Sequence, residues 1–92
     1  MSFFLKDPQS RTDYAIDWGG YLAGQTIAGS AWSVVPDEAG GVAVDAAGFD
    51  ATRTAATLTG GVAGHVYSVS NHVTLSDGRG DDRSIVVRVE QR

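Results

Sequence analysis

The sequence predicts an all-β fold, in the form of a small antiparallel β-sandwich. Residues 65–75 and 84–90 alternate between apolar and polar side chains, which is the pattern of strands with one buried face. Turn residues recur about every ten residues, and no window shows a helical apolar stripe of useful length. A chain of 92 residues is long enough for one such domain, which we expect to span residues 1–92.

The first eight residues form an expected N-terminal arm. Phe3, Phe4 and Leu5 make an apolar cluster near the chain start, and Lys6 follows them. Two interpretations stay open. The arm either adds an edge strand to the sheet of its own domain or packs on a neighbouring subunit.

Four strands are expected between the arm and the last third of the chain. Two of them alternate, and each places its large residues on one inner face: Tyr14, Ile16 and Trp18 in residues 13–18, and Trp32 and Val34 in residues 26–35. Residues 19–25 are expected to form a bend or a single helical turn between these two strands. Residues 42–44 and 52–58 are expected to be short, weak strands because they are rich in Ala and Thr.

The last third of the chain predicts a long β-hairpin. The apolar positions of its two strands share one face: Tyr67, Val69, Val73 and Leu75 in the first, and Ile85, Val87 and Val89 in the second. Asp77-Gly78, followed by Gly80, supplies the positive-φ positions of a hairpin loop. We therefore expect a hairpin tip at residues 76–83, which carries three Asp and two Arg residues.

Two residues on the first hairpin strand refine the expected fold. Leu58, Gly64 and Tyr67 resemble the tyrosine corner of immunoglobulin and fibronectin sandwiches, in which the phenol bonds back to the backbone. This pattern favours an immunoglobulin/fibronectin-like sandwich. Asn71 lies on the inner face of the strand, and its amide is expected to bond to backbone groups of a neighbouring loop.

Composition narrows the functional classes. A net charge of −4 argues against a nucleic-acid surface, and the absence of cysteine excludes a disulfide framework or a thiolate metal site. No apolar stretch is long enough to span a membrane, and Met1–Lys6 lacks the basic start of a signal peptide. We expect synthesis in the cytoplasm.

Candidate chemistry is weak throughout the chain. His65 and His72 are seven residues apart on one strand, so they lie on opposite faces and cannot share a metal ion. No nucleophile elbow is present. The stretch 77–82 resembles a calcium loop only faintly because Arg79 stands where a ligand belongs, and the tripeptide Arg-Gly-Asp at 79–81 is interpreted as a coincidence. We expect no enzyme, no catalytic residue, no cofactor and no metal.

Docking is the function that the residues favour, with the arm and the hairpin tip as its two surfaces. The candidate interface residues are Phe3, Phe4, Leu5, Lys6, Asp77, Arg79, Asp81, Asp82 and Arg83. Charges on a rigid tip contribute specificity at an interface. We expect that deleting Met1–Lys6, or reversing the charges of Arg79 and Arg83, leaves the domain folded but weakens assembly.

The order and spacing of several motifs resemble a family of small tailed-phage proteins. These motifs are Phe4-Leu5-Lys6-Asp7-Pro8, Asp13-Tyr14-Ala15-Ile16-Asp17-Trp18, Tyr21-Leu22, Thr26-Ile27-Ala28-x-Ser30-x-Trp32, Gly60-Gly61-x-x-Gly64-x-x-Tyr67-x-Val69-x-Asn71 and Gly78-Arg79-x-Asp81-Asp82-Arg83-Ser84. The chain is similar to phage fiber-tail adaptors, also called tail fibre ports, over nearly its whole length. It departs from them at residues 9–12, which are more polar, and residues 37–51 match mainly in length.

The resemblance implies a virion structural protein with an immunoglobulin-like fold, made in the host cytoplasm and present in several copies around the head–tail neck. It also implies docking on a ring of neck or tail subunits, of connector, stopper or terminator type, and attachment of side or tail fibres, without nucleic acid or membrane. An immunoglobulin-like binding module, of the adhesin or carbohydrate-binding type, is the alternative. A sugar binder needs an exposed aromatic platform, whereas Trp18 and Trp32 are expected on inner faces.

Overall fold

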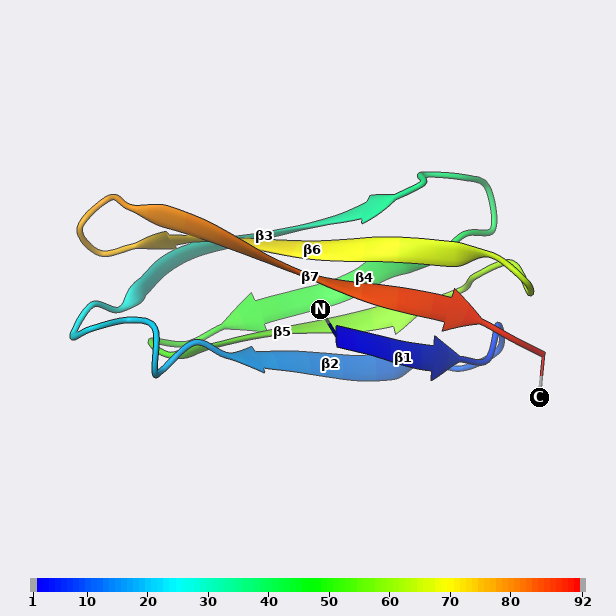
Figure 1. The fold of residues 1–92 in the computed structure, drawn as a ribbon, viewed down its shortest axis with the longest axis horizontal. Coiled ribbons are helices and arrows are strands. Elements are labelled where there is room, and N and C mark those ends of the chain that lie inside the picture. Colours follow the sequence, from blue (N-terminus) through cyan, green and yellow to red (C-terminus); the bar gives the residue numbers. More distant parts are fainter. Residues whose placement is uncertain (1, 92) are drawn as a thin grey trace.

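The computed structural model describes residues 2–91, with side chains from residue 5 onward, and within these residues the chain forms seven strands in two sheets (Figure 1). The strands are β1 (Ser2–Lys6), β2 (Thr12–Asp17), β3 (Ile27–Val35), β4 (Ala43–Phe49), β5 (Arg53–Thr59), β6 (Val66–Leu75) and β7 (Gly80–Val89). The two sheets pack face to face, which confirms the expected small β-sandwich. None of the described residues forms a helix that could cross a membrane.

The strand order divides the chain between a four-stranded sheet, β1-β7-β6-β3, and a three-stranded sheet, β2-β5-β4. β1 runs parallel to β7, whereas the other pairs are antiparallel. Apart from β1, the two groups β2-β5-β4 and β7-β6-β3 follow the order of an immunoglobulin sandwich, whose first strand joins the other sheet. The sandwich is established, and its immunoglobulin-like type stays a prediction.

Two strands are longer than expected, and pairing explains both. β4 continues to Phe49 instead of ending at residue 44, because it pairs with β5 as far as Phe49 opposite Thr54. β7 begins at Gly80 instead of Ser84, since Thr74 pairs with Gly80. The expectation that residues 76–83 form one loop is therefore wrong. Only residues 76–79 form the turn, and Asp81, Asp82 and Arg83 lie on a strand.

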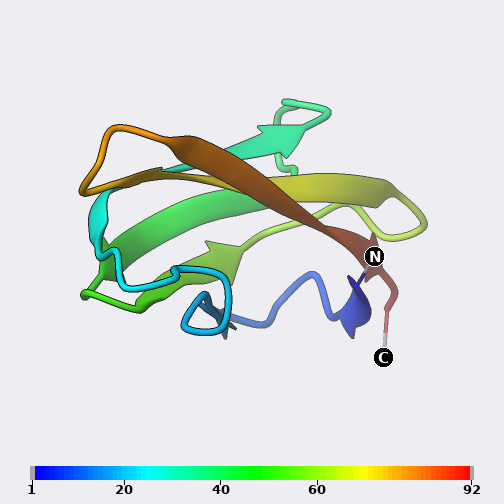
Figure 2. The same ribbon diagram turned by 60° about the vertical axis from the view of Figure 1, so that its left-hand side comes forward.

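The two sheets stack as two layers of strands (Figure 2), and the molecule measures 42 × 21 × 20 Å. Its interior consists of two hydrophobic clusters. One cluster contains Val42, Ala56, Leu58, Tyr67, Val69, Ile85, Val87 and Val89. The other contains Ile16, Trp18, Leu22, Ile27, Val73 and Leu75. Tyr14 and Trp32 pack against both, with their ring centroids 6.5 Å apart in an edge-to-face arrangement, so these two aromatic residues connect the clusters.

A buried chain of hydrogen bonds joins the two sheets. Trp18 Nε1 donates to Thr54 Oγ1 (3.1 Å), and Thr54 Oγ1 donates to Asn71 Oδ1 (2.6 Å). Asn71 Nδ2 in turn donates to Ser30 Oγ (2.9 Å) and to the carbonyl of Ala31 (3.1 Å). The amide of Asn71 was expected to bond to a loop, but its partners lie on β5 of the opposite sheet and on β3, the neighbour of β6 in its own sheet, because the side chain points into the space between the sheets.

Tyr67 makes the backbone contact that its spacing predicts. Val62 N donates to the phenol oxygen (3.0 Å), and the phenol donates to Glu38, which also bonds to His65 Nδ1 (2.8 Å). Burial and this carboxylate raise the pKa of Tyr67, and the bonds from Tyr67 and His65 lower the pKa of Glu38. Tyr67 thus ties the β3–β4 loop to the start of β6.

Candidate docking surfaces

The turn between β6 and β7 is fixed by its own residues. Gly78 adopts a φ of 91°, and Leu75 N donates to the carbonyl of Arg79 (2.7 Å). The carboxylate of Asp77 accepts from Arg79 N (3.0 Å) and from Arg79 Nε (2.7 Å). These bonds, led by the backbone N–H of Arg79, lower the pKa of Asp77. The loop therefore presents Arg79, two-thirds of whose side chain is exposed, in a defined orientation.

The side chains of Asp81 and Arg83 lie on the inner face of β7, beyond the end of the hydrophobic core. In register they lie opposite Val73 and Asn71, on the same face as Ile85. The guanidinium carbon of Arg83 lies 4.4 Å from the ring centroid of Trp18, within cation–π distance. A hydrogen bond between Tyr21 and Asp81 raises the pKa of Tyr21. Both charged side chains thus contact the β2–β3 loop.

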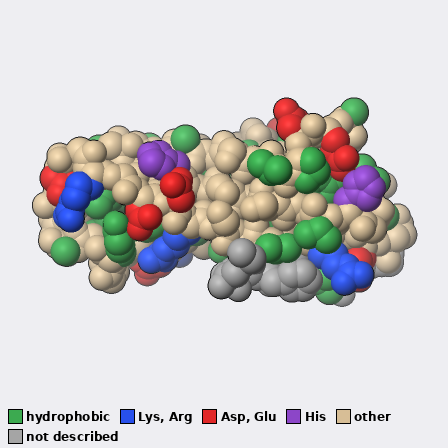
Figure 3. Space-filling view, turned by 45° about the horizontal axis from the view of Figure 1, so that its top comes forward, with side chains coloured by type: hydrophobic (Ala, Val, Ile, Leu, Met, Phe, Trp, Pro, Cys, Tyr) green, Lys and Arg blue, Asp and Glu red, His purple; other side chains and the backbone are tan. Residues whose placement is uncertain are grey.

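Asp82 points to the opposite face of the hairpin. Its Oδ1 lies 2.8 Å from His72 Nδ1, and both side chains are more than half exposed. The expectation that His72 lies on the outer face is confirmed. Figure 3 shows charged side chains and a histidine gathered toward the left of the view, where Figure 1 places the hairpin end, and a largely uncharged stretch beside them.

The hairpin end holds several charged side chains that contact the rest of the domain. Each of Asp77, Arg79, Asp81, Asp82 and Arg83 contacts another residue of the same chain. Among the residues whose side chains are described, no group of three or more His, Cys, Asp or Glu could hold a metal ion. The geometry offers oriented carboxylates and guanidinium groups, which suit recognition of a complementary charged surface.

The arm adopts the first of its two interpretations, as an edge strand of its own sheet. β1 pairs with β7 from Ser2 opposite Ile85 to Lys6 opposite Val89. Leu5 is 43% exposed. The side chains of Phe3 and Phe4 lie outside the described residues. The second interpretation, contact of the arm with a neighbouring subunit, stays a prediction.

Lys6 is buried inside its own domain. Its Nζ donates to the carbonyls of Asp7 (3.0 Å), Ser10 (2.6 Å) and Gly60 (2.7 Å). Burial lowers the pKa of Lys6, and the neighbouring carboxylate of Asp7 partly opposes this shift. The ammonium thus secures β1 to the loops beside β2 and β5, so its side chain does not form part of an exposed docking surface in this conformation.

The two expected docking surfaces do not meet. Lys6 lies beside Val89 at the end of β7, whereas the hairpin turn precedes the start of β7 at Gly80. Figure 1 shows the turn at the left end of the molecule and the end of β1 toward the right. A partner that contacts both segments would have to extend along the long axis of the sandwich.

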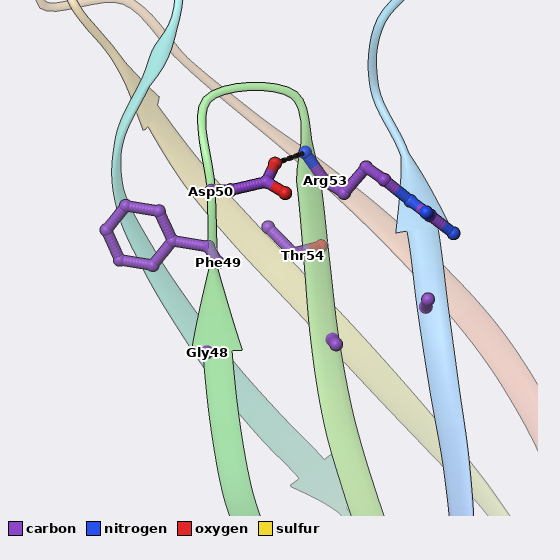
Figure 4. A pocket seen from close by; sticks show the side chains of 7 residues that line it. Gly48, Phe49, Asp50, Arg53 and Thr54 are labelled. Carbon is purple, nitrogen blue, oxygen red and sulfur yellow. Dashed lines mark hydrogen bonds between the residues drawn. The ribbon is translucent and has the colours of Figure 1, made fainter.

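A third surface escaped the sequence analysis because its residues carry little chemistry. A shallow hollow of about 410 Å³ lies against β4 and β5, lined by Ala15, Gly48, Phe49, Asp50, Arg53, Thr54 and Ala55 (Figure 4). Asp50 Oδ1 accepts from Thr52 N and Arg53 N (2.9 Å each), and these bonds lower the pKa of Asp50. Its carboxylate therefore stabilises the β4–β5 turn. The Ala- and Gly-rich segment 43–49 was the only available signal.

The class of protein that the fold and these side chains define is a small all-β sandwich with oriented charges at one end. The chain matches, over residues 6–88, the family model described as "Podophage GP4 fiber-tail adaptor protein gp77", and it belongs to this family. The family resemblance inferred from the sequence is thereby confirmed. No curated protein matches the chain. Membership places the protein among structural adaptors of phage tails, which are virion components and not a family of enzymes.

Proposed function

We propose that this protein is a non-enzymatic adaptor at the head–tail neck of a tailed phage, where it docks on a ring of neck or tail subunits and attaches side or tail fibres. Family membership supports the adaptor role. The neck, the ring and the absence of catalysis are our proposal. We further propose that the chain is made in the host cytoplasm and that several copies bind each particle.

The observation that carries the proposal is the fixed arrangement of charge at the hairpin end. Asp77 orients Arg79, and Trp18 orients Arg83, so these side chains lose little conformational freedom when they meet a partner. Exposed ion pairs add little to the stability of a domain, but complementary charges select a partner and its orientation. Repetition around a ring multiplies each modest contact.

The arm supplies the second proposed contact. Leu5 exposes a large part of its side chain on an edge strand, and we assign Phe3 and Phe4 to the same contact. Lys6 contributes indirectly, because its three hydrogen bonds hold β1 in place. Deletion of Met1–Lys6 would therefore also disturb the fold, so substitution of Leu5 is the cleaner probe of this surface.

Neither tryptophan supports the alternative of a carbohydrate-binding module. Trp18 is fully buried, and Trp32 is half-buried with its Nε1 shielded from solvent. The described residues therefore contain no exposed tryptophan platform for a sugar ring.

The proposal is tested by complementing a phage that lacks the gene with charge-reversed chains. The double variant Arg79→Glu/Asp82→Lys should reduce the number of copies per purified particle at least tenfold, because it inverts two exposed charges at the hairpin end. Quantitative mass spectrometry of the particles measures the copy number.

The matched control is Asp37→Lys, which reverses an exposed charge in the β3–β4 loop, outside both proposed docking surfaces. This variant should be incorporated like the wild type. Equal incorporation of the control and the double variant would remove the hairpin end from the docking surface.

A further inference from the structure

β4 is exposed along nearly its whole length. Six of its seven residues are exposed, and only Val44 is half-buried. β4 pairs with β5 on one edge, and within the described residues β3 lies beside it without joining its ladder. A free edge presents backbone N–H and C=O groups that can pair with a strand of another chain.

The β3–β4 side of the sandwich lacks the charges that usually protect such an edge. β3 contains no charged residue, and β4 contains only Asp45, whose carboxylate lies 2.5 Å from Arg11 Nη1 of the same chain. Beyond the end of β4, Asp50 is used by its own turn. Natural proteins commonly block a free edge with Lys, Pro or another charge, and the segment 46–49 contains none of them.

Gly48 is not required by the fold. It lies outside the left-handed region of φ, and a Cβ added to it meets no atom within 4 Å. Glycine weakens a strand, so its presence here needs another reason, and close approach of a second backbone is a recurrent one. Three hollows meet at Gly48: the one in Figure 4, a second of about 340 Å³ that extends along β4 and β5 to Ala46 and Thr57, and an edge hollow of about 360 Å³ lined by Ser30, Ala47, Gly48 and Phe49.

We infer that a second copy of this chain occupies the edge, with the two β4 strands antiparallel about a two-fold axis near Ala47. The two three-stranded sheets then form one continuous sheet, and Phe49, now 48% exposed, is covered by the second copy.

Charge favours a second copy as the occupant. Self-pairing of the uncharged segment 46–49 brings no like charges opposite each other, and a charged partner strand would find no complementary group along that segment. Self-pairing of the other edge of this sheet, β2, would bring Asp13 and Asp17 of each copy close to the same carboxylates of the other.

One short strand per copy makes a small interface. We expect weak association of the isolated chain, with a dissociation constant on the order of 100 μM. The inference does not depend on the neck location proposed above, since it concerns the purified chain alone.

Sedimentation equilibrium of the full chain between about 10 μM and 1 mM tests the inference. The wild type should shift from monomer toward dimer across this range. Gly48→Lys and Gly48→Glu should each remain monomeric, because position 48 lies diagonal to its counterpart across the axis and like charges repel there. An equimolar mixture of the two variants should recover dimer, since opposite charges then face each other.

Gly20→Lys is the matched control, because Gly20 also has open space around its Cβ position and an ordinary φ. It should dimerise like the wild type, and thermal unfolding should show that all variants are folded. A wild type that stays monomeric at 1 mM, or a Gly48→Lys variant that dimerises like Gly20→Lys, overturns the inference. A mixture that stays monomeric rules out the symmetric pairing.

Discussion

The two long sides of the sandwich differ in how their strand edges are treated. On the β1–β2 side, the buried ammonium of Lys6 secures β1, and Asp13 and Asp17 place charge on β2. On the β3–β4 side, β3 and residues 46–49 of β4 carry no charge and lie side by side without a shared ladder. The side chains of β4 are exposed along nearly its whole length. Charge that protects a strand edge is thus concentrated on the β1–β2 side, and the inferred association uses the β3–β4 side.

The largest loss of stability is expected from a substitution of Lys6, which secures β1 on the β1–β2 side. Lys6→Met should reduce the free energy of unfolding by about 3 kcal/mol, because three partly buried carbonyls lose their donor. Urea denaturation followed by tryptophan fluorescence measures the change. Arg11→Ala, which removes an exposed ion pair with Asp45, is the control and should cost less than about 1 kcal/mol. Equal effects would show that Lys6 does not secure the arm.

A smaller effect is expected from the centre of the sandwich, which both sides share. Thr54→Val should cost about 2 kcal/mol, because Trp18 Nε1 loses its acceptor and Asn71 Oδ1 its donor while the side-chain shape is retained. Thr57→Val changes a half-buried threonine of the same strand whose hydroxyl donates to Asp13 (2.7 Å) in a solvent-exposed hydrogen bond, and it should cost about 0.5 kcal/mol. Chemical denaturation of both variants compares them. A smaller loss for Thr54→Val than for Thr57→Val would contradict a stabilising role for the network.

The smallest loss of stability is expected from a substitution of Glu38 in the loop between β3 and β4. Hydrogen bonds from Tyr67 and His65 hold the pKa of Glu38 below its ordinary value, so folding favours its charged form. This contribution to stability is fully present well above the ordinary pKa of a glutamate and is lost as the pH falls through the lower pKa of the folded state. Between pH 6 and pH 3, the unfolding temperature should therefore fall less steeply for Glu38→Gln than for the wild type. Parallel curves would show that Glu38 does not stabilise the loop.

Much of the fold could be predicted because the closing hairpin carries a local signal. Alternation from Tyr67 to Leu75 and from Ile85 to Val89 reports which residues face the core, and this face depends only on the strand period. The spacing of Gly64 and Tyr67 likewise predicted a phenol bonded to nearby backbone. These features involve residues close together in the sequence.

The candidate site was harder to predict because its contacts are distant in sequence. A lysine in a short terminal arm is expected to be exposed, yet Lys6 is buried and donates to the carbonyl of Gly60. Asp81 and Arg83 were assigned to a loop because turn residues surround them, but pairing with β6 extends β7 to Gly80. Arg83 then reaches Trp18, from a different part of the chain.

The sequence by itself determined the strand period, the positions of most turns, the inner residues of the hairpin and the family of the chain. Each of these depends on neighbouring residues or on their order. Only the tertiary structure decided that β4 extends to Phe49 and remains exposed, and that Lys6 is buried. An Ala- and Gly-rich strand has little intrinsic preference, so its length follows from pairing with β5. The burial of an ammonium likewise depends on carbonyls that the fold brings to it.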